Sequence, residues 1–448
     1  MSSDYILQRD LNANLPMAVR GDGIYIYDDS GKKYLDGSSG AAVSCLGHSN
    51  QNVKDAIIEQ LSSLPYAHTS FLTSNPAEIL AKKLIERAPD NFEKVYFLSG
   101  GSEAVETALK LVRQYHLENN QPQRTNIIAR KQSYHGNTLT TLSVGGNVKR
   151  KEVFLPYMSD SMHHIAPVYA YRLKKDNETL EEYGIRAANL LEEKILELGI
   201  DTVSAFIYEP LVGSTLGSVG APTSYHKRIR EICDKYGVLL ISDEIMCGYG
   251  RTGYLFTSEY TRIKPDVITL AKGIGGGYQP LAATLVSSKI YQAIKNGSGS
   301  FSHGHTYISH PCATAAGIAV LKEIEDNKLL ENVRIMGKFL KDQLKDRFSQ
   351  NQYVGDIRGK GLFVSVELVK NKNTKECFNP KLKLFAQIKQ TAKELGLLCY
   401  PMGGTNFGEE GDHILLAPPF IINKKQIIEL IDKLELSINK SLEIKGII

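Results

Sequence analysis

The chain has 448 residues, of which 42% are hydrophobic, and it carries a formal net charge of +4. This length is about two to three times that of a typical single domain, so we expect at least two domains. The basic residues are scattered apart from short clusters, and no apolar run approaches the roughly 20 residues of a membrane span, so composition argues against a nucleic-acid-binding or membrane-spanning protein.

The cysteines and the N-terminus both favour a cytoplasmic location. The six cysteines form no CxxC pair and no zinc-binding spacing. Free thiols are the usual state in a reducing compartment. The first ten residues, MSSDYILQRD, contain no apolar stretch typical of a signal peptide.

The first predicted elements form a hairpin. Two short apolar runs, at 23–27 and 33–36, flank the turn-rich segment DDSG (28–31). Further along, short apolar runs alternate with longer amphipathic stretches, which predicts a mainly parallel sheet with helices on both faces. These runs lie at 95–98, 126–129, 203–208, 238–242, 266–270 and 281–286.

The two ends of the chain have a different pattern from its middle. Residues 361–368 and 414–421 have the composition of strands and are separated by a helical stretch. We therefore expect the ends to form a second, smaller α+β domain. The predicted division is an N-terminal segment at 1–70, a large domain at 71–325 and a C-terminal domain at 326–448.

Polar groups follow several predicted strands, and the carboxyl ends of parallel strands meet at one edge of a sheet, where ligands bind. Asp243 ends one apolar run and Lys272 ends the next. A lysine and an aspartate so placed suit pyridoxal 5′-phosphate: the lysine forms a Schiff base with the aldehyde, and the aspartate pairs with the pyridinium nitrogen. Upstream, SGGS (99–102) follows the run at 95–98 and opens a helix, which is typical of a phosphate site.

Two other kinds of site fit the sequence poorly. A dinucleotide-binding motif would need GxGxxG, but the segment that begins at Gly273 reads GIGGGY and has Tyr278 at the sixth position. A metal site would need a third ligand beside His303 and His305, and none lies nearby in the sequence. We therefore predict neither a Rossmann oxidoreductase nor a metal enzyme.

An ordered set of motifs resembles the class III aminotransferases, pyridoxal-phosphate enzymes of fold type I. Single pieces are weak, but their order and spacing hold across nearly the whole chain. The matching segments are YLDGSSG (34–40), LGH (46–48), SGGSEAVETALKLVRQY (99–115), YHG (134–136), EP (209–210), ISDEIMCGYGRTG (241–253), LAKGIGGGYQPLAA (270–283), HGHTY (303–307), RGKGL (358–362) and APP (417–419).

The resemblance implies roles for the strand-end residues. Lys272 would be the lysine that binds the cofactor aldehyde and then moves the proton of the substrate carbon. Asp243 would pair with the pyridine nitrogen, and Tyr134 would stack on the ring. Gly101 and Ser102 would bind the phosphate from the helix N-terminus.

The resemblance also places His135, Glu209 and Met246 beside the cofactor. Thr306 would reach the phosphate of the neighbouring subunit, which implies a homodimer with shared active sites. A non-enzymatic binding protein of this fold is disfavoured because Lys272 is present.

Two departures from the family pattern concern the cofactor and the substrate. Many relatives have a glutamine where this chain has Met246. The ornithine-type enzymes have an arginine for the substrate α-carboxylate where this chain has Leu415, and the stretch 402–411 contains no arginine. The resemblance therefore implies a transaminase that moves an amino group from an amine or ω-amino acid to a keto acid such as pyruvate or 2-oxoglutarate, by a ping-pong mechanism. The alternative is a phospho-lyase or an amino-acid racemase of the same class that uses Lys272.

Overall fold

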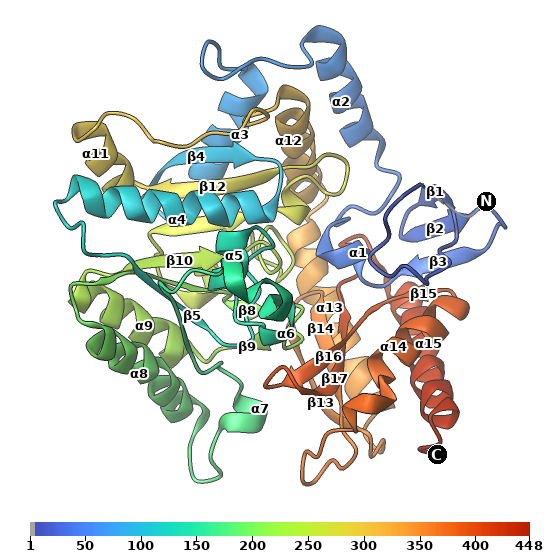
Figure 1. The fold of residues 1–448 in the computed structure, drawn as a ribbon. Helices are drawn as coiled ribbons and strands as arrows, with labels where there is room; N and C mark the ends of the chain where they lie inside the picture. The colour runs from blue at the N-terminus through green and yellow to red at the C-terminus, as the bar shows by residue number, and fades with distance from the viewer. Residues whose placement is uncertain (1–4) are drawn as a thin grey trace.

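The computed structural model describes residues 5–448, and its centre is a seven-stranded sheet in the order β4-β12-β11-β10-β7-β5-β6 (Figure 1). Strand β12 runs antiparallel to β4 and β11, whereas the other pairs in the sheet are parallel. The expected mainly parallel sheet is therefore confirmed. Its strands are β4 (Phe92–Leu98), β5 (Asn126–Arg130), β6 (Met162–Ile165), β7 (Val203–Tyr208), β10 (Leu239–Asp243), β11 (Val267–Leu270) and β12 (Ala282–Ser287).

Apolar side chains that point alternately to the two faces of the central strands explain why helices cover both faces of this sheet. In β7 every side chain is buried, with Phe206 and Tyr208 facing the core under α8 and α9, and Ala205 and Ile207 facing the core under α4 and α11. The sheet thus lies between two helical layers (Figure 1). These helices are α4 (Gly101–Glu118), α8 (Leu180–Leu198), α9 (Thr223–Tyr236) and α11 (Ser288–Asn296).

Three further helices lie near the β4 edge of the large sheet. Helix α12 packs against both α2 and α3, and α3 contacts β4. Their bounds are α2 (Gln51–Ser63), α3 (Asn75–Ile85) and α12 (Pro311–Asp326). Helix α12 begins at Pro311, whose fixed φ suits the first position of a helix. The short elements are α1 (Ser39–Ala42), α5 (Leu139–Val144), α6 (Val148–Lys151), η1 (Glu152–Tyr157), α7 (Ala170–Leu173), β8 (Leu211–Val212), β9 (Val219–Gly220), α10 (Ser258–Thr261), η2 (Lys272–Ile274) and η3 (Pro380–Leu382).

The C-terminal region forms an antiparallel sheet, in the order β13-β14-β17-β16, with helices packed on it. Its elements are α13 (Leu329–Arg347), β13 (Val354–Lys360), β14 (Phe363–Leu368), α14 (Leu384–Glu394), β16 (Tyr400–Asn406), β17 (Glu410–Leu416) and α15 (Lys424–Ile444).

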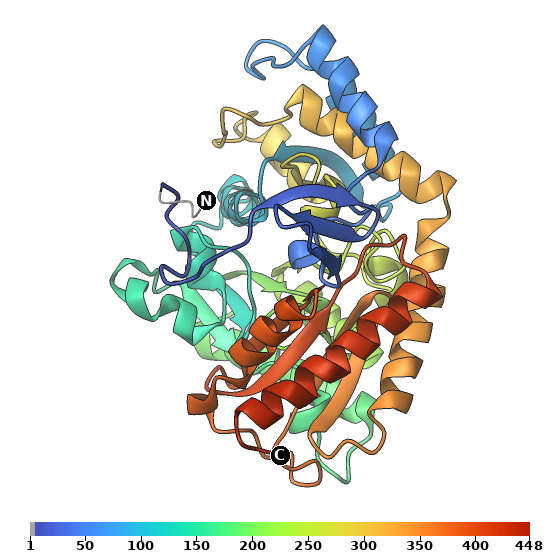
Figure 2. The same cartoon turned by 90° about the vertical axis from the view of Figure 1, so that its right-hand side faces the viewer.

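The N-terminal strands join the C-terminal region through one parallel strand pair. Strand β15 (Leu397–Leu398) pairs with β3 (Lys33–Asp36), which also forms the predicted hairpin with β2 (Tyr25–Asp28); β1 (Ala18–Asp22) completes this sheet. Figure 2 shows the blue N-terminal strands beside the orange and red C-terminal elements.

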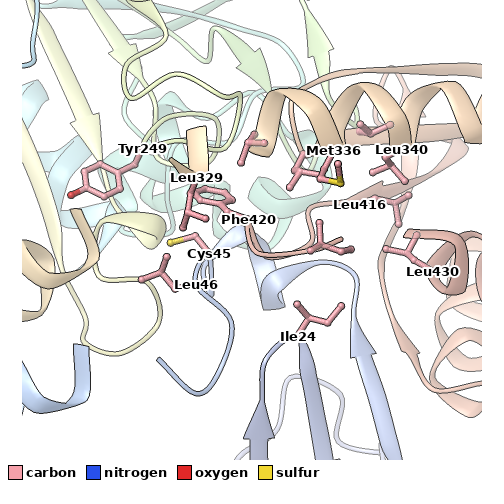
Figure 3. Close-up of a cluster of buried hydrophobic side chains, with 14 of the residues drawn as sticks. Ile24, Cys45, Leu46, Tyr249, Leu329, Met336, Leu340, Leu416, Phe420 and Leu430 are labelled. Atoms are coloured by element: carbon pink, nitrogen blue, oxygen red, sulfur yellow. The ribbon is translucent and has the colours of Figure 1, made fainter. Parts of the chain in front are cut away.

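A continuous apolar core links these regions, and Figure 3 shows the part where they meet. It brings together side chains from the N-terminal segment, the middle of the chain and the C-terminal region. The labelled members are Ile24, Cys45, Leu46, Tyr249, Leu329, Met336, Leu340, Leu416, Phe420 and Leu430. Because this core crosses all three predicted segments, the division at 1–70, 71–325 and 326–448 stays a prediction. None of the helices in residues 5–448 combines the length and the apolar character that crossing a membrane requires.

Candidate active site

A cavity of about 640 Å³ lies at the carboxyl edge of the large sheet. Residues at or after the ends of five strands that run in the same direction line it, because chain direction brings those strand ends to the same edge. The structure thereby brings together most of the residues that the sequence singles out. They are Ser99, Gly100, Gly101 and Ser102 after β4, Tyr134 and His135 after β5, Glu209 after β7, Asp243 at the end of β10 and Lys272 after β11.

Asp243 is held by three hydrogen bonds at the bottom of this cavity. Its Oδ2 lies 2.7 Å from Nδ1 of His135, and its Oδ1 accepts from the backbone N–H of Ile245 at 3.2 Å and from Thr269 Oγ1 at 3.3 Å. Both Asp243 and His135 are buried. The carboxylate is therefore fixed in one orientation by groups on three different elements.

Lys272 combines an unusual backbone conformation with a perturbed amine. Its φ is +55°, a left-handed value that costs a non-glycine residue energy and that recurs at functional sites. Burial lowers the pKa of the Lys272 amine from 10.5 to about 8, although the carboxylates of Asp243 and Glu209 oppose the shift. At pH 7 about a tenth of the amine is therefore neutral, and so nucleophilic, far more than for an unperturbed lysine.

The N-terminus of α4 opens onto the same cavity and is built for an anion. Gly100 is its N-cap, and no side chain caps the first N–H groups of the helix. A Cβ at Gly100 would meet no atom within 4 Å, whereas one at Gly101 would lie 3.0 Å from Ile245 Cδ1. The Ser102 hydroxyl accepts a hydrogen bond from the backbone N–H of Asn137 at 3.0 Å, so its own proton stays available.

Glu209 and Met246 form a second side of the cavity. The Glu209 carboxylate accepts backbone N–H groups of Tyr134 and Gly213, each at 3.0 Å, and burial raises the pKa of this carboxyl group. A Cβ at Gly213 would come within 2.3 Å of Met246 Sδ, so the glycine makes room for the methionine. Met246, which stands where many relatives have glutamine, thus lies at the cavity wall.

Two arginines that no sequence motif marks also line the cavity. Arg150, in α6, places its guanidinium carbon 4.8 Å from the centroid of the Tyr134 ring, and Arg9 lines the cavity from the N-terminal segment. The cluster Lys149–Lys151 is visible in the sequence, but a short basic cluster is usually a solvated surface. No local signal distinguishes Arg150 from its neighbours.

Two other sequence-predicted positions lie outside the cavity wall. Thr306 is exposed, and its backbone carbonyl accepts a hydrogen bond from the hydroxyl of Tyr66 at 2.8 Å. Leu415 is only 1% exposed and packs in an apolar cluster with neighbours such as Phe363 and Leu211. The position at which ornithine-type relatives have an arginine is thus part of the core in this chain.

The residues around the cavity fit pyridoxal 5′-phosphate. The uncapped first turn of α4 suits a phosphate group, and the buried Asp243 suits a protonated ring nitrogen. The amine of Lys272 faces the same space, as required for a bond to the aldehyde. Residues 5–448 contain no group of three or more His, Cys, Asp or Glu residues arranged to hold a metal ion.

Comparisons with known proteins agree with this fit. The family described as aminotransferase class-III matches residues 7–438. An uncharacterized aminotransferase of Schizosaccharomyces pombe is 41% identical over 98% of this chain and 95% of its own length. The putrescine–pyruvate aminotransferase of Pseudomonas aeruginosa is 35% identical over 92% of this chain and 88% of its own. Among solved structures, the omega transaminase from Pseudomonas jessenii in complex with PMP has a TM-score of 0.92 and 33% identity, covering 99% of this chain and 98% of that one.

Proposed function

Because this chain belongs to the class III aminotransferase family, we propose that it moves an amino group from an amine or ω-amino acid to a keto acid such as pyruvate or 2-oxoglutarate. It is a transaminase that depends on pyridoxal 5′-phosphate. The observation that carries the proposal is the meeting of Lys272, Asp243 and the N-terminus of α4 in one cavity. These three features supply an amine, a buried anion and an anion-binding helix end.

The substrate class rests on one position of the chain and on the names of relatives. Leu415 stands where the ornithine-type enzymes have the arginine that holds the substrate α-carboxylate, so this chain lacks that arginine. The Pseudomonas aeruginosa relative is named for a diamine donor and pyruvate, and the Pseudomonas jessenii structure is an omega transaminase. Both favour donors whose reacting amine is not next to a carboxylate.

Lys272 and Asp243 carry the proposed proton chemistry. When bound, pyridoxal 5′-phosphate supplies an aldehyde that takes up the amino group and a ring that accepts the electrons of the substrate C–H bond. The Lys272 amine would bind the cofactor aldehyde and would then take and return the proton of the substrate carbon, which its lowered pKa favours. The Asp243 carboxylate would keep a proton on the ring nitrogen, and His135 holds that carboxylate in place.

The remaining residues position the cofactor and keep water out. The backbone N–H groups of Gly101 and Ser102, with the Ser102 hydroxyl, would bind the phosphate at the start of α4. The Tyr134 ring would stack on the cofactor, and Glu209 fixes the backbone of Tyr134 by accepting the N–H of that residue. Met246 gives the wall beside Gly213 an apolar surface.

The active unit in this proposal is a homodimer in the cytoplasm. Thr306 is exposed and absent from the wall of the cavity in its own chain, which supports the interpretation that it binds the phosphate of the neighbouring subunit. The cytoplasmic location is supported by the six cysteines, all of which are free thiols.

A donor–acceptor panel tests the proposal. The purified enzyme with its cofactor would be offered putrescine, β-alanine, 4-aminobutyrate and benzylamine as donors, each against pyruvate, 2-oxoglutarate and glyoxylate. We expect one amino acid to form from the keto acid for each carbonyl released from the donor. Release of inorganic phosphate from a phosphorylated amine, or racemisation of an amino acid without any acceptor, would instead support the lyase or the racemase.

A further inference from the structure

We propose that the guanidinium of Arg150 binds the carboxylate of the keto-acid acceptor, with Arg9 as a second cation at the same cavity. The inference rests on the proposed function. It assigns to Arg150 the carboxylate-binding role that an arginine at position 415 has in the ornithine-type enzymes. It concerns the acceptor, because every keto acid has a carboxylate next to its reacting carbonyl, whereas a simple amine donor has none.

The position of Arg150 is the first support. The residue lies in α6, in the segment that follows β5 and Tyr134, and it lines the cavity together with Lys272. It is half-buried, and its guanidinium lies over the Tyr134 ring, 4.8 Å from the centroid. An aromatic face restricts the side chain to one side of the ring, which pre-orients the guanidinium before a ligand arrives.

The guanidinium donors of Arg150 have no partner among the described residues, which is the second observation that supports a carboxylate site. Within residues 5–448 its side chain makes no ion pair and no hydrogen bond, and only its backbone N–H is engaged, by Asn147. The two carboxylates of the cavity already have partners: Asp243 is bound by His135, and Glu209 accepts two backbone N–H groups. The fork of donors on Arg150 is therefore free for a bidentate carboxylate.

The electric field of Arg150 reaches the reacting amine. Burial is the main cause of the lowered pKa of Lys272, and the charge of Arg150 adds to the lowering. Burial likewise raises the pKa of Tyr134, and the charges of Arg150 and Arg9 oppose that shift. A carboxylate bound at Arg150 thus lies within electrostatic range of Lys272.

The two fully buried arginines near the site already bind backbone carbonyl groups of the fold. Arg251 donates to the backbone carbonyls of Leu362 and Pro418, and Arg130 donates to the carbonyl of Glu209. Neither lines the cavity, whereas Arg9 and Arg150 do. Arg9 is exposed, so its contribution to binding is expected to be smaller than that of Arg150.

The test compares the two half-reactions of Arg150→Gln with those of a matched control, Lys149→Gln. Lys149 is an exposed neighbour in α6, so its variant removes the same charge outside the cavity wall. In single-turnover experiments, we expect Arg150→Gln to need about 10- to 100-fold more pyruvate for half-maximal rate. The rate of the amine half-reaction with benzylamine should change less than about two-fold, because benzylamine has no carboxylate that Arg150 could bind. Arg150→Lys should restore part of the pyruvate affinity, and Arg9→Gln should have a smaller effect.

A binding measurement separates recognition of the acceptor from a general loss of the site. Calorimetric titration of the aminated holoenzyme with succinate, which cannot react, should show weaker binding in Arg150→Gln and unchanged binding in Lys149→Gln. Affinity for the cofactor should be the same in both variants. An equal loss of pyruvate, amine and cofactor affinity in Arg150→Gln would overturn the inference, as would unchanged succinate binding.

The half-reactions of the wild-type enzyme distinguish a failed role for Arg150 from a failed transaminase function. If the wild-type enzyme performs neither half-reaction with any donor or acceptor of the panel, the proposed function is wrong. If the wild type performs both and Arg150→Gln matches it with pyruvate, only the role of Arg150 is wrong.

Discussion

His135 and Asp243 form a buried pair in which the imidazole Nδ1 lies 2.7 Å from the carboxylate Oδ2. His135 is 1% exposed and Asp243 is 3% exposed, so water does not compete for this contact. The two residues are 108 positions apart in the sequence and meet because β5 and β10 end at the same edge of the sheet. His135 therefore acts through Asp243, as a positioning residue.

Replacing His135 by phenylalanine should destabilise the site without removing it. The Asp243 carboxylate would keep its bonds from Ile245 and Thr269 but lose its shortest one, so the free energy of unfolding should fall by about 1–3 kcal/mol. The amine half-reaction should slow as well, because the carboxylate is then less well oriented. Chemical denaturation and single-turnover kinetics would measure the two effects. His163→Phe, on β6 and outside the cavity wall, is the control and should leave the kinetics unchanged.

Asp243→Asn should have a larger kinetic effect than any change at His135. The amide keeps the size and hydrogen-bonding capacity of the side chain but removes the negative charge that stabilises a protonated ring nitrogen. We expect the amine half-reaction to slow by several orders of magnitude, equivalent to roughly 4 kcal/mol of transition-state stabilisation. Rapid-mixing absorbance would give the rate. A variant within ten-fold of the wild type would mean that Asp243 is not the partner of the ring nitrogen.

The perturbed amine of Lys272 predicts a particular pH dependence. Burial disfavours the protonated amine, so its pKa falls to about 8, and the reactive neutral form increases as the pH rises through that value. The rate at which the enzyme freed of cofactor recombines with pyridoxal 5′-phosphate should rise up to about pH 8 and then level off. A rate that continues to rise beyond pH 10 would indicate an unperturbed lysine. Borohydride reduction and peptide mapping should label Lys272, and Lys272→Ala should show neither the labelling nor turnover.

Mixed dimers test the role of Thr306. If Thr306 binds the phosphate of the neighbouring subunit, a dimer made of one Thr306→Ala chain and one Lys272→Ala chain concentrates both defects in one active site. That site would have neither lysine nor threonine, and the other would have both. Such dimers should therefore retain about half of the wild-type activity per dimer, at wild-type cofactor affinity. If Thr306 served its own chain, each site would carry one defect and cofactor affinity would be weakened at the only site with Lys272.

The sequence predicts the sheet and most of the cavity wall because both depend on local patterns. Strands that are apolar on both faces indicate a parallel sheet, and the residues after them then meet at one edge by topology alone. Strand β6 is missed because only Ile165 is buried in its four residues, so MHHI lacks an apolar pattern.

Contacts between distant segments could not be predicted in the same way. The motif YHG marks His135, but nothing in it indicates that the ring binds Asp243. Arg150 lies in a run of three basic residues, and only the path of the chain after β5 separates it from Lys149. Arg9 lies in a polar N-terminal segment with no periodic pattern, and its place at the cavity follows from the tertiary fold.

Substitutions of Leu415 should change the stability of the protein more than its preference among donors. The side chain is 1% exposed among apolar neighbours, so Leu415→Arg would force a larger, charged side chain into a packed core and should lower the free energy of unfolding by about 3 kcal/mol or more. Leu415→Met, of similar volume, should cost less than about 1.5 kcal/mol. Since position 415 lies in the core and not on the cavity wall, Leu415→Met should also keep the wild-type preference for amines over ornithine. Thermal unfolding and donor kinetics would measure both effects. A stable Leu415→Arg enzyme that prefers ornithine would show that an arginine in this position reaches the substrate, and that the missing α-carboxylate clamp depends on this single residue.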